Sequence, residues 1–311
     1  KRQAVVPVED TSEPWRDPER PLPDQIRISR TVQSGDYVRP VGEDIMAGQP
    51  VLAPGHVLRP QEIGVMAALG VGRVEVHRRP RVGLLSTGDE LMAVDQALEP
   101  GKIRDSNSYA QAAQVQMLGA EPLNLGVAAD REEDVRRKLA RGLDEGVNLF
   151  VSSAGVSVGA YDVVKAVLEK EGNVGFWRVR MRPGKPLAFG SYYGVPYLGL
   201  PGNPVSAMVS FERFARPAIL KLSGIQNLNR PQITVLFQED IESDGRETYV
   251  RAVVSRTPDG YEAVSTGSQG SHVLTSLVKA NALVIIPEGM KRVKDGAELE
   301  ALMIDWPENV F

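Results

Sequence analysis

The chain has 311 residues, of which 42% are hydrophobic and 24% charged, and its formal net charge is −4. This length favours two or three domains. The net negative charge gives no overall positive potential that would attract nucleic acid. With no cysteine and only three histidines, disulfides, cysteine nucleophiles and thiolate metal sites are excluded and a histidine-rich metal site is disfavoured. No apolar run approaches the roughly 20 residues of a membrane span, and residues 1–10 lack the apolar core of a signal peptide. We therefore expect a cytoplasmic protein without a membrane or nucleic-acid partner.

The first part of the chain, residues 1–79, is expected to form a β-rich domain. Alternating apolar and polar residues over 26–32 predict a strand. Glycines then recur about every seven residues, which indicates short strands joined by tight turns. These glycines are Gly35, Gly42, Gly48 and Gly55. A short apolar-periodic stretch from Arg59 to Leu69, with a proline near its start, predicts a helix.

Residues 80–224 alternate strands with helices, which predicts a central three-layer α/β/α domain with a mostly parallel sheet. The expected strands are residues 82–86, 121–127, 149–153, 174–179, 187–190 and 197–200. The expected helices are residues 106–118, 130–143, 160–170 and 205–221. Asp105 or Ser106 is expected to cap the first of these helices.

The last part of the chain, residues 228–311, follows a linker at 224–230 and is again strand-like. The expected strands are residues 234–236, 248–253, 261–264 and 282–286. The pair Asp244-Gly245 is typical of a hairpin turn. We expect a small C-terminal β domain that resembles a barrel.

Loops rich in polar residues and glycine follow the expected strands of the central domain. In an open parallel sheet, ligands bind at the carboxyl ends of the strands, so these loops should share one edge. The four loops are Ser86–Leu91, Ser152–Asp162, Arg180–Pro186 and Leu200–Pro204. The second is suited to cradle an anion before a helix, and the third contributes cations for phosphate.

Each loop also has an ordinary explanation. Gly88-Asp89 after a strand is often only a turn, and Asp130 alone is more often a helix cap than a catalyst. Alternating Arg178, Arg180 and Arg182 are typical of a solvated strand face. The convergence of four such loops nevertheless favours a site for a polyanion with a divalent metal. Physical reasoning from the residues stops at a phosphorylated ligand and Mg²⁺.

Five motifs occur in one order and spacing: Ser86–Leu91, Asp105–Asn107, Ser152–Asp162, Arg182–Pro186 and Leu200–Ser206. Together they resemble the molybdopterin molybdenumtransferase family, which includes the E domain of gephyrin. Residues 38–45 and 55–58 resemble the preceding domain of that family. The α/β fold alone would be less specific, because molybdopterin adenylyltransferases and CinA-like proteins share it.

The resemblance implies a reaction and a set of ligands. Adenylylated molybdopterin binds in the α/β domain, molybdenum from molybdate is inserted, and AMP is released with the help of Mg²⁺. The resemblance also implies an elongated homodimer with sites near the subunit interface. It also implies the molybdopterin adenylyltransferase as a partner protein.

The resemblance also assigns roles to residues at matching positions. The catalytic residues are Asp44, Glu90, Asp130 and Asp162, and the metal ligands are Asp89 and Glu90. The substrate-binding residues are Thr87, Gly88, Ser152, Gly155, Ser157, Gly159, Arg178, Arg182, Pro183, Gly184, Lys185, Pro201, Gly202, Asn203 and Pro204. Among these, the basic side chains would neutralise phosphates or molybdate.

Two departures from the family pattern leave alternatives open. Ala154 stands where the family usually has a glycine, and an inserted segment with an Asp-Gly-Tyr-Ala motif and a Met-Thr-Gly motif does not occur. The strand-like opening Val5–Val8 favours a fragment over a naturally shortened homologue. One alternative function is a molybdopterin-binding or scaffold module that does not complete the reaction. A related nucleotide enzyme on the same fold is another, and the flanking β-rich regions argue against it.

Overall fold

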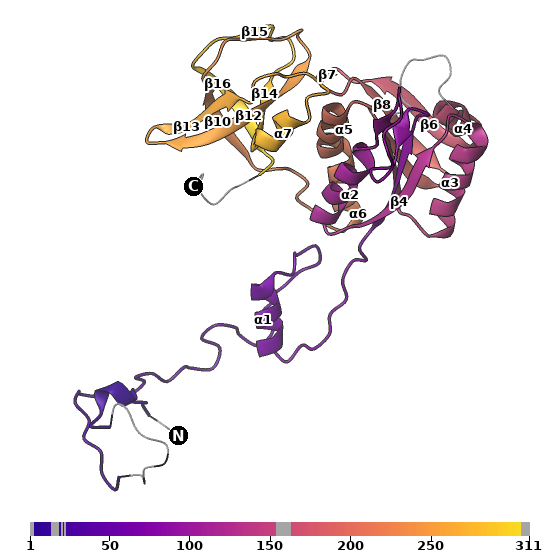
Figure 1. Ribbon diagram of the computed structural model, residues 1–311. Helices are drawn as coiled ribbons and strands as arrows, with labels where there is room; N and C mark the ends of the chain where they lie inside the picture. The colour runs from indigo at the N-terminus through magenta and orange to yellow at the C-terminus, as the bar shows by residue number, and fades with distance from the viewer. Residues whose placement is uncertain (1–2, 14–18, 20, 22, 154–162, 306–311) are drawn as a thin grey trace. The chain divides into compact units, whose positions relative to one another are not determined.

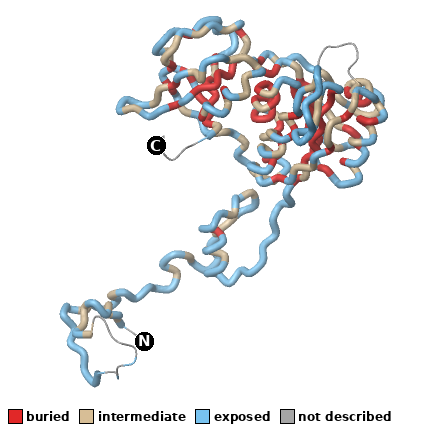
Figure 2. The backbone as a smooth tube through the Cα atoms, viewed as in Figure 1, coloured by how far each residue is buried: buried red, intermediate tan, exposed pale blue. Residues whose placement is uncertain are grey.

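The computed structural model describes residues 3–13, 19, 21, 23–153 and 163–305. The chain divides into two compact units, Lys1–Leu69 and Gly70–Phe311 (Figure 1). The second unit contains nearly all of the buried residues (Figure 2).

The first unit contains a short 3₁₀ helix, η1 (Val8–Asp10), and the helix α1 (Pro60–Ala68). The prediction of α1 is confirmed, and the amide of Arg59 donates a hydrogen bond of 2.8 Å to the Glu62 carboxylate at its start.

The short strands expected in this unit are not formed among its described residues, where the one β contact is an isolated bridge between Thr11 and Ile28. Turns do occur at all four glycines, which have positive φ angles. The alternation over 26–32 was misleading because a strand also needs a neighbouring strand to pair its amide and carbonyl groups. The described part of residues 1–79 therefore does not itself form the strands of the predicted β-rich domain.

The second unit begins with a six-stranded sheet in the order β4-β1-β5-β9-β8-β6. These strands are β4 (Glu121–Ala128), β1 (Arg81–Thr87), β5 (Leu149–Ser153), β9 (Val195–Leu200), β8 (Pro186–Tyr192) and β6 (Gly172–Arg178). The first four are parallel, whereas β8 and β6 extend the sheet in antiparallel fashion. The prediction of a mostly parallel sheet is confirmed.

Helices cover both faces of this sheet (Figure 1). They are α2 (Asn107–Met117), α3 (Glu132–Asp144), α4 (Val163–Glu171), α5 (Pro204–Ser210), the π-helical η2 (Phe211–Ala215) and α6 (Arg216–Leu222). Val82, Leu84 and Val151 pack toward α2, η2 and α6, whereas Leu85 and Phe150 pack toward α3 and α4. The three-layer architecture follows from this alternation of buried side chains along each strand.

The expected helix over 205–221 forms in three consecutive sections. The π turn of η2 lies directly before Pro217, which has no amide hydrogen to continue the regular helical pattern. No helix among the described residues is both long and apolar enough to span a bilayer.

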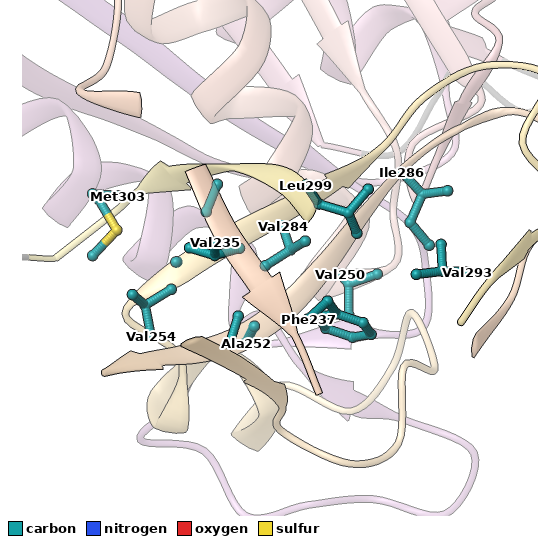
Figure 3. Close-up of a cluster of buried hydrophobic side chains, with 13 residues drawn as sticks. Val235, Phe237, Val250, Ala252, Val254, Val284, Ile286, Val293, Leu299 and Met303 are labelled. Atoms are coloured by element: carbon teal, nitrogen blue, oxygen red, sulfur yellow. The ribbon is translucent and has the colours of Figure 1, made fainter. Parts of the chain in front are cut away.

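A five-stranded barrel follows, in the order β13-β10-β16-β14-β12, and the pairing of β13 with β12 closes it. Its strands are β10 (Gln232–Phe237), β12 (Glu247–Thr257), β13 (Gly260–Ser265), β14 (Ala282–Ile286) and β16 (Ala297–Met303). Phe237, Val250, Val284 and Leu299 fill its interior (Figure 3). The helix α7 (Thr275–Lys279) adjoins β12. The predicted C-terminal barrel-like β domain is confirmed.

The hairpin expected at Asp244-Gly245 is wrong. That turn joins β11 (Ile241–Glu242) to β12, but β11 pairs with β15 (Arg292–Val293) instead. The Asp244 side chain bonds Arg246 rather than closing a two-stranded ladder.

One short strand connects the sheet and the barrel. Residues Met181–Arg182 form β7, which follows β6 in the chain but pairs with Glu247 and Thr248 of β12. The segment that continues to Lys185 therefore lies where the sheet and the barrel meet, and this junction holds the candidate site.

Candidate functional site

A cavity of about 670 Å³ opens where the parallel strands end and the barrel begins. Thr87 at the end of β1, Ser153 at the end of β5 and Pro201 after β9 all line it. The barrel contributes Arg246 and Gln269. The cavity therefore occupies the carboxyl edge of the sheet, the position expected for a ligand in an open parallel sheet.

The structure brings most of the described loop residues expected from the sequence into this cavity. They are Thr87, Glu90, Arg182, Pro183, Gly184, Lys185, Pro201, Gly202, Asn203 and Pro204. Gly88 lies against the Glu90 side chain. A Cβ at position 88 would lie within 2.7 Å of both carboxylate oxygens of Glu90, so only glycine fits there without a shift. Gly88 also has a φ of 139°, a conformation that other residues rarely adopt.

Other expected residues lie elsewhere. Ser152 is fully buried, and its hydroxyl accepts a 2.6 Å hydrogen bond from Tyr197 inside the sheet. Arg178, the last residue of β6, pairs with Pro186 of β8 and does not line the cavity. Asp44 is an exposed residue of the other unit. Gly155, Ser157, Gly159 and Asp162, with Ala154, lie outside the described residues.

Two groups of cavity residues were not assigned to the site from the sequence. The first is Arg104–Asn107, which was interpreted as the start of a helix; Asp105 does accept the Ser108 amide at 3.1 Å, so that capping prediction is confirmed. The second comprises Arg246 and Gln269–Ser271 of the barrel. No local pattern marks this second group, because only the tertiary fold brings it to the sheet.

Asp89 and Glu90 follow β1, and Asp130 follows β4 near both of them; of the three, only Glu90 lines the cavity. The Asp89 carboxylate accepts a 3.1 Å hydrogen bond from the Asp130 amide. Partial burial raises the pKa of Asp130, and the nearby charges of Asp89 and Glu90 raise it further. A cation at this place would relieve the repulsion between these carboxylates, which adds to the effect of burial on the pKa of Asp130.

The basic residues of the cavity differ in whether a carboxylate lies close enough to neutralise their charge. Arg246 forms an ion pair with Asp244, whose pKa is lowered to about 2 chiefly by these hydrogen bonds, and it also donates to the Met181 carbonyl at 3.1 Å. Arg182 lies 3.9 Å from the same Asp244. Lys185 is exposed and forms no ion pair with any described residue. Of these three side chains, Lys185 is therefore the most available to an anionic ligand.

Hydrogen bonds fasten the sheet loops to one another and to the barrel. The Asn107 side chain donates to the Gly202 carbonyl at 2.7 Å. The Asn203 side chain donates to the Ser271 hydroxyl at 3.1 Å, and the Val205 amide donates to the Ser271 carbonyl at 3.1 Å. These bonds hold the two walls of the cavity in register.

Asn203→Ala is expected to loosen one wall of the cavity with a small loss of stability. It removes the bond to the Ser271 hydroxyl but leaves the Val205 bond intact. We expect a loss of about 0.5–1.5 kcal/mol in the free energy of unfolding and a higher KM with little change in kcat. Urea denaturation and steady-state kinetics measure the two effects. Asn227→Ala, whose side chain bonds only the nearby Asn229 amide, is the matched control; an equal effect from it would remove the role given to Asn203.

Three protein-family models match the chain. They are described as "MoeA N-terminal region (domain I and II)" over residues 1–70, "Probable molybdopterin binding domain" over 83–221, and "MoeA C-terminal region (domain IV)" over 234–304. The cavity is lined by residues of the second and third ranges.

Curated relatives and a solved structure agree with these matches. The molybdopterin molybdenumtransferase of Haemophilus influenzae is 35% identical over 274 residues, which cover 87% of this chain and 68% of the relative. That of Nostoc sp. is 36% identical over 308 residues, covering 97% and 70%. A crystal structure of the molybdopterin biosynthesis MoeA protein from Pyrococcus horikosii matches with a TM-score of 0.78 and 27% identity, covering 98% of this chain and 73% of that one. The chain thus belongs to the molybdopterin molybdenumtransferase family, and the resemblance inferred from its motifs is confirmed.

Proposed function

We propose that this chain inserts molybdenum from molybdate into adenylylated molybdopterin and releases AMP. The observation that carries the proposal is the cavity, where two side chains line one opening at the carboxyl edge of the sheet: Glu90, which lies near Asp130, and Lys185, which pairs with no described carboxylate. Membership of the molybdopterin molybdenumtransferase family supports this reaction over others that use the same fold.

The side chains suggest how the cavity binds and orients a phosphorylated ligand. Lys185 and Arg182 would contact its phosphate oxygens, because charge-assisted hydrogen bonds to phosphate are the strongest that these side chains make. The stiff Pro201–Pro204 turn, held by Asn107, would shape the wall opposite them. The proposal thus assigns binding to the basic side chains and positioning to the turn.

The carboxylates fit a magnesium ion only if the substrate shares it. Among the described residues, no three carboxylate or histidine side chains converge as metal ligands. Mg²⁺ is, however, commonly held by one or two carboxylates together with substrate phosphates. Asp89 and Glu90, beside Asp130, meet that requirement. The ion would neutralise phosphate charge as AMP leaves.

Asp130→Asn is expected to stabilise the fold while weakening the response to Mg²⁺. Because the pKa of Asp130 is raised in the folded chain, the stability contributed by its protonation is present at low pH and is lost as pH rises through that pKa. Above that pKa, the neutral amide of the variant removes the charge repulsion with Asp89 and Glu90. Melting temperatures measured below pH 3.8, the ordinary aspartate pKa, and at neutral pH should differ less in the variant than in the original chain.

The same substitution should raise the Mg²⁺ concentration that half-saturates AMP release by about tenfold. Glu133→Gln, an exposed charge on α3, is the matched control. An unchanged Mg²⁺ response in Asp130→Asn would remove Asp130 from the cation site.

Further parts of the proposal concern organisation and partners. We propose three domains, residues 1–79, 80–224 and 228–311, because the three family models fall within these ranges. We also propose a cytoplasmic homodimer that receives its substrate from a molybdopterin adenylyltransferase. These last points rest on the family resemblance, and sedimentation velocity and a pull-down with the adenylyltransferase would test them.

The test of the main proposal is titration calorimetry of the full chain with adenylylated molybdopterin, with and without Mg²⁺, followed by an AMP assay after molybdate is added. Binding with molybdate-dependent AMP release is the expected result. Binding without release would instead support a binding module. Absence of binding would contradict the assignment of the cavity.

A further inference from the structure

The barrel is held against the sheet at two places. Beside the cavity, β7 pairs with β12, and Asn203 and Val205 form hydrogen bonds with Ser271. The second place is the linker over residues 224–230, which leaves α6 and leads into β10. A rigid body that is attached at one place can pivot about it. The second attachment therefore determines the angle at which the barrel meets the sheet.

A buried ion cluster fastens this linker to the helices. Glu212 of η2 is 9% exposed, and its two carboxylate oxygens accept hydrogen bonds of 2.6 Å and 2.9 Å from Nε and Nη2 of Arg230. Nε of Arg216 on α6 lies 3.3 Å from the same carboxylate, and its Nη1 donates to the Leu228 carbonyl at 2.7 Å. We call Glu212, Arg216 and Arg230 the linker clamp, because they tie the end of the linker to η2 and α6.

The charges of the linker clamp are not balanced among its own members. Hydrogen bonds to Glu212 raise the pKa of Arg230, and the charge of Asp305 raises it further. Burial lowers the pKa of Arg216, whose Nε is shielded from water and donates no hydrogen bond to a described residue. Buried clusters of this kind are often no more stabilising than apolar side chains of the same size. Stability alone therefore does not explain the clamp.

Apolar packing is incomplete on the same side of the junction. Val209 of α5 belongs to one buried cluster with Leu283 and Leu302 of the barrel. A groove of about 390 Å³ nevertheless opens there, lined by the three clamp residues and by apolar side chains of both the helices and the barrel. None of the described residues that line this groove also lines the cavity. The clamp thus spans a part of the junction that apolar side chains leave unfilled.

The π turn that carries Glu212 also reaches the barrel directly. The guanidinium of Arg213, the next residue of η2, lies 5.2 Å from the centre of the Tyr249 ring on β12. Single π turns within helices are frequent at functional sites. Two consecutive side chains of η2 therefore contact the linker and the barrel.

We propose that Glu212 is a positioning residue for the cavity. Through Arg230 and Arg216 it fixes the linker, and the linker fixes the angle between the barrel and the sheet. The cavity has one wall on the sheet and one on the barrel, so this angle sets its width. The link to substrate rests on the proposed function, whereas the angle itself can be measured without substrate.

The first experiment measures how narrowly the barrel is held. The chain has no cysteine, so Glu133→Cys on α3 and Glu298→Cys on β16, both exposed, introduce one spin label on each side of the junction. Double electron–electron resonance should give one narrow distance distribution, which becomes about twofold broader when Glu212→Gln is added. Glu145→Gln removes an exposed ion pair with Arg141 on α3 and, as the matched control, should leave the distribution unchanged.

A second variant keeps the proposal testable if Glu212→Gln does not fold. Glu212→Met, Arg216→Met and Arg230→Met together remove all three charges and keep the length of the side chains. Because none of the three charges is left buried without its partner, we expect a melting temperature equal to or above that of the original chain. The distance distribution should still become about twofold broader, because the linker has lost its attachment.

Kinetics separate a positioning role from mere support of the fold. In the triple variant, KM for adenylylated molybdopterin should rise about tenfold with less than about a twofold change in kcat. A broader distribution and a higher KM at an undiminished melting temperature support the proposal. A narrow distribution with the original KM in the folded triple variant overturns it, as does a lower melting temperature with a narrow distribution. If the original chain releases no AMP, the proposed function fails, while broadening in the variants still supports the clamp.

Discussion

Lys185→Ala is expected to lower kcat/KM for molybdate-dependent AMP release by about 10- to 100-fold, with little change in the free energy of unfolding. The side chain is exposed, lines the main cavity and forms no ion pair with a described residue, so its removal costs the fold little. A charge-assisted hydrogen bond to phosphate contributes about 1.5–3 kcal/mol, which corresponds to this loss. Steady-state kinetics and calorimetry with adenylylated molybdopterin measure it.

The control for this substitution is Lys221→Ala, which removes an equally exposed lysine from the end of α6, away from the cavity. Lys185→Arg should retain part of the activity, since it keeps the charge. A large fall in melting temperature with unchanged affinity would show that Lys185 supports the fold instead.

Gly184→Ala is expected to lower the free energy of unfolding by about 2–5 kcal/mol and to disturb the cavity wall. Gly184 has a φ of 108°, which L-residues avoid at a cost of about 1–2 kcal/mol. An added Cβ would also collide with the Ser210 hydroxyl and lie 3.1 Å from the end of the Met181 side chain. Overpacking of this kind costs about 1–3 kcal/mol more. Urea denaturation measures the total.

Ser210→Ala separates the two contributions. The Ser210 hydroxyl is buried and has no hydrogen-bond partner in the described structure, so its removal alone should be neutral or stabilising. In the double variant the collision is relieved while the backbone strain remains. We therefore expect a partial rescue, with a coupling energy of about 1 kcal/mol or more between the two positions. Strictly additive effects would contradict the contact.

The sheet and much of the site were predictable because their signals are local. The apolar runs at 82–86 and 149–153 were predicted to be strands covered on both faces, and β1 and β5 confirm this. Thr87, Glu90 and Lys185 were placed together because parallel strands end at one edge of a sheet.

The remaining features depend on contacts between distant parts of the chain. Arg246 and Ser271 line the cavity where the barrel meets the sheet, a junction that includes the pairing of β7 with β12. No sequence pattern predicts a strand of two residues. Ser152 and Ser153 are adjacent, yet Ser153 lines the cavity while the Ser152 hydroxyl is held by Tyr197 inside the sheet. A glycine- and serine-rich motif does not show which hydroxyl faces the ligand.

The pairing of β7 with β12 has a consequence for how this molecule can be divided. A barrel excised at the linker over residues 224–230 would lose the neighbour of Glu247 and Thr248 and expose their backbone groups. Unpaired strand edges of this kind recruit other chains and promote aggregation. The excised barrel would also lack Arg182, which lines the cavity. A domain boundary at residues 224–230 therefore separates β7 from β12, although these two strands are hydrogen-bonded to each other.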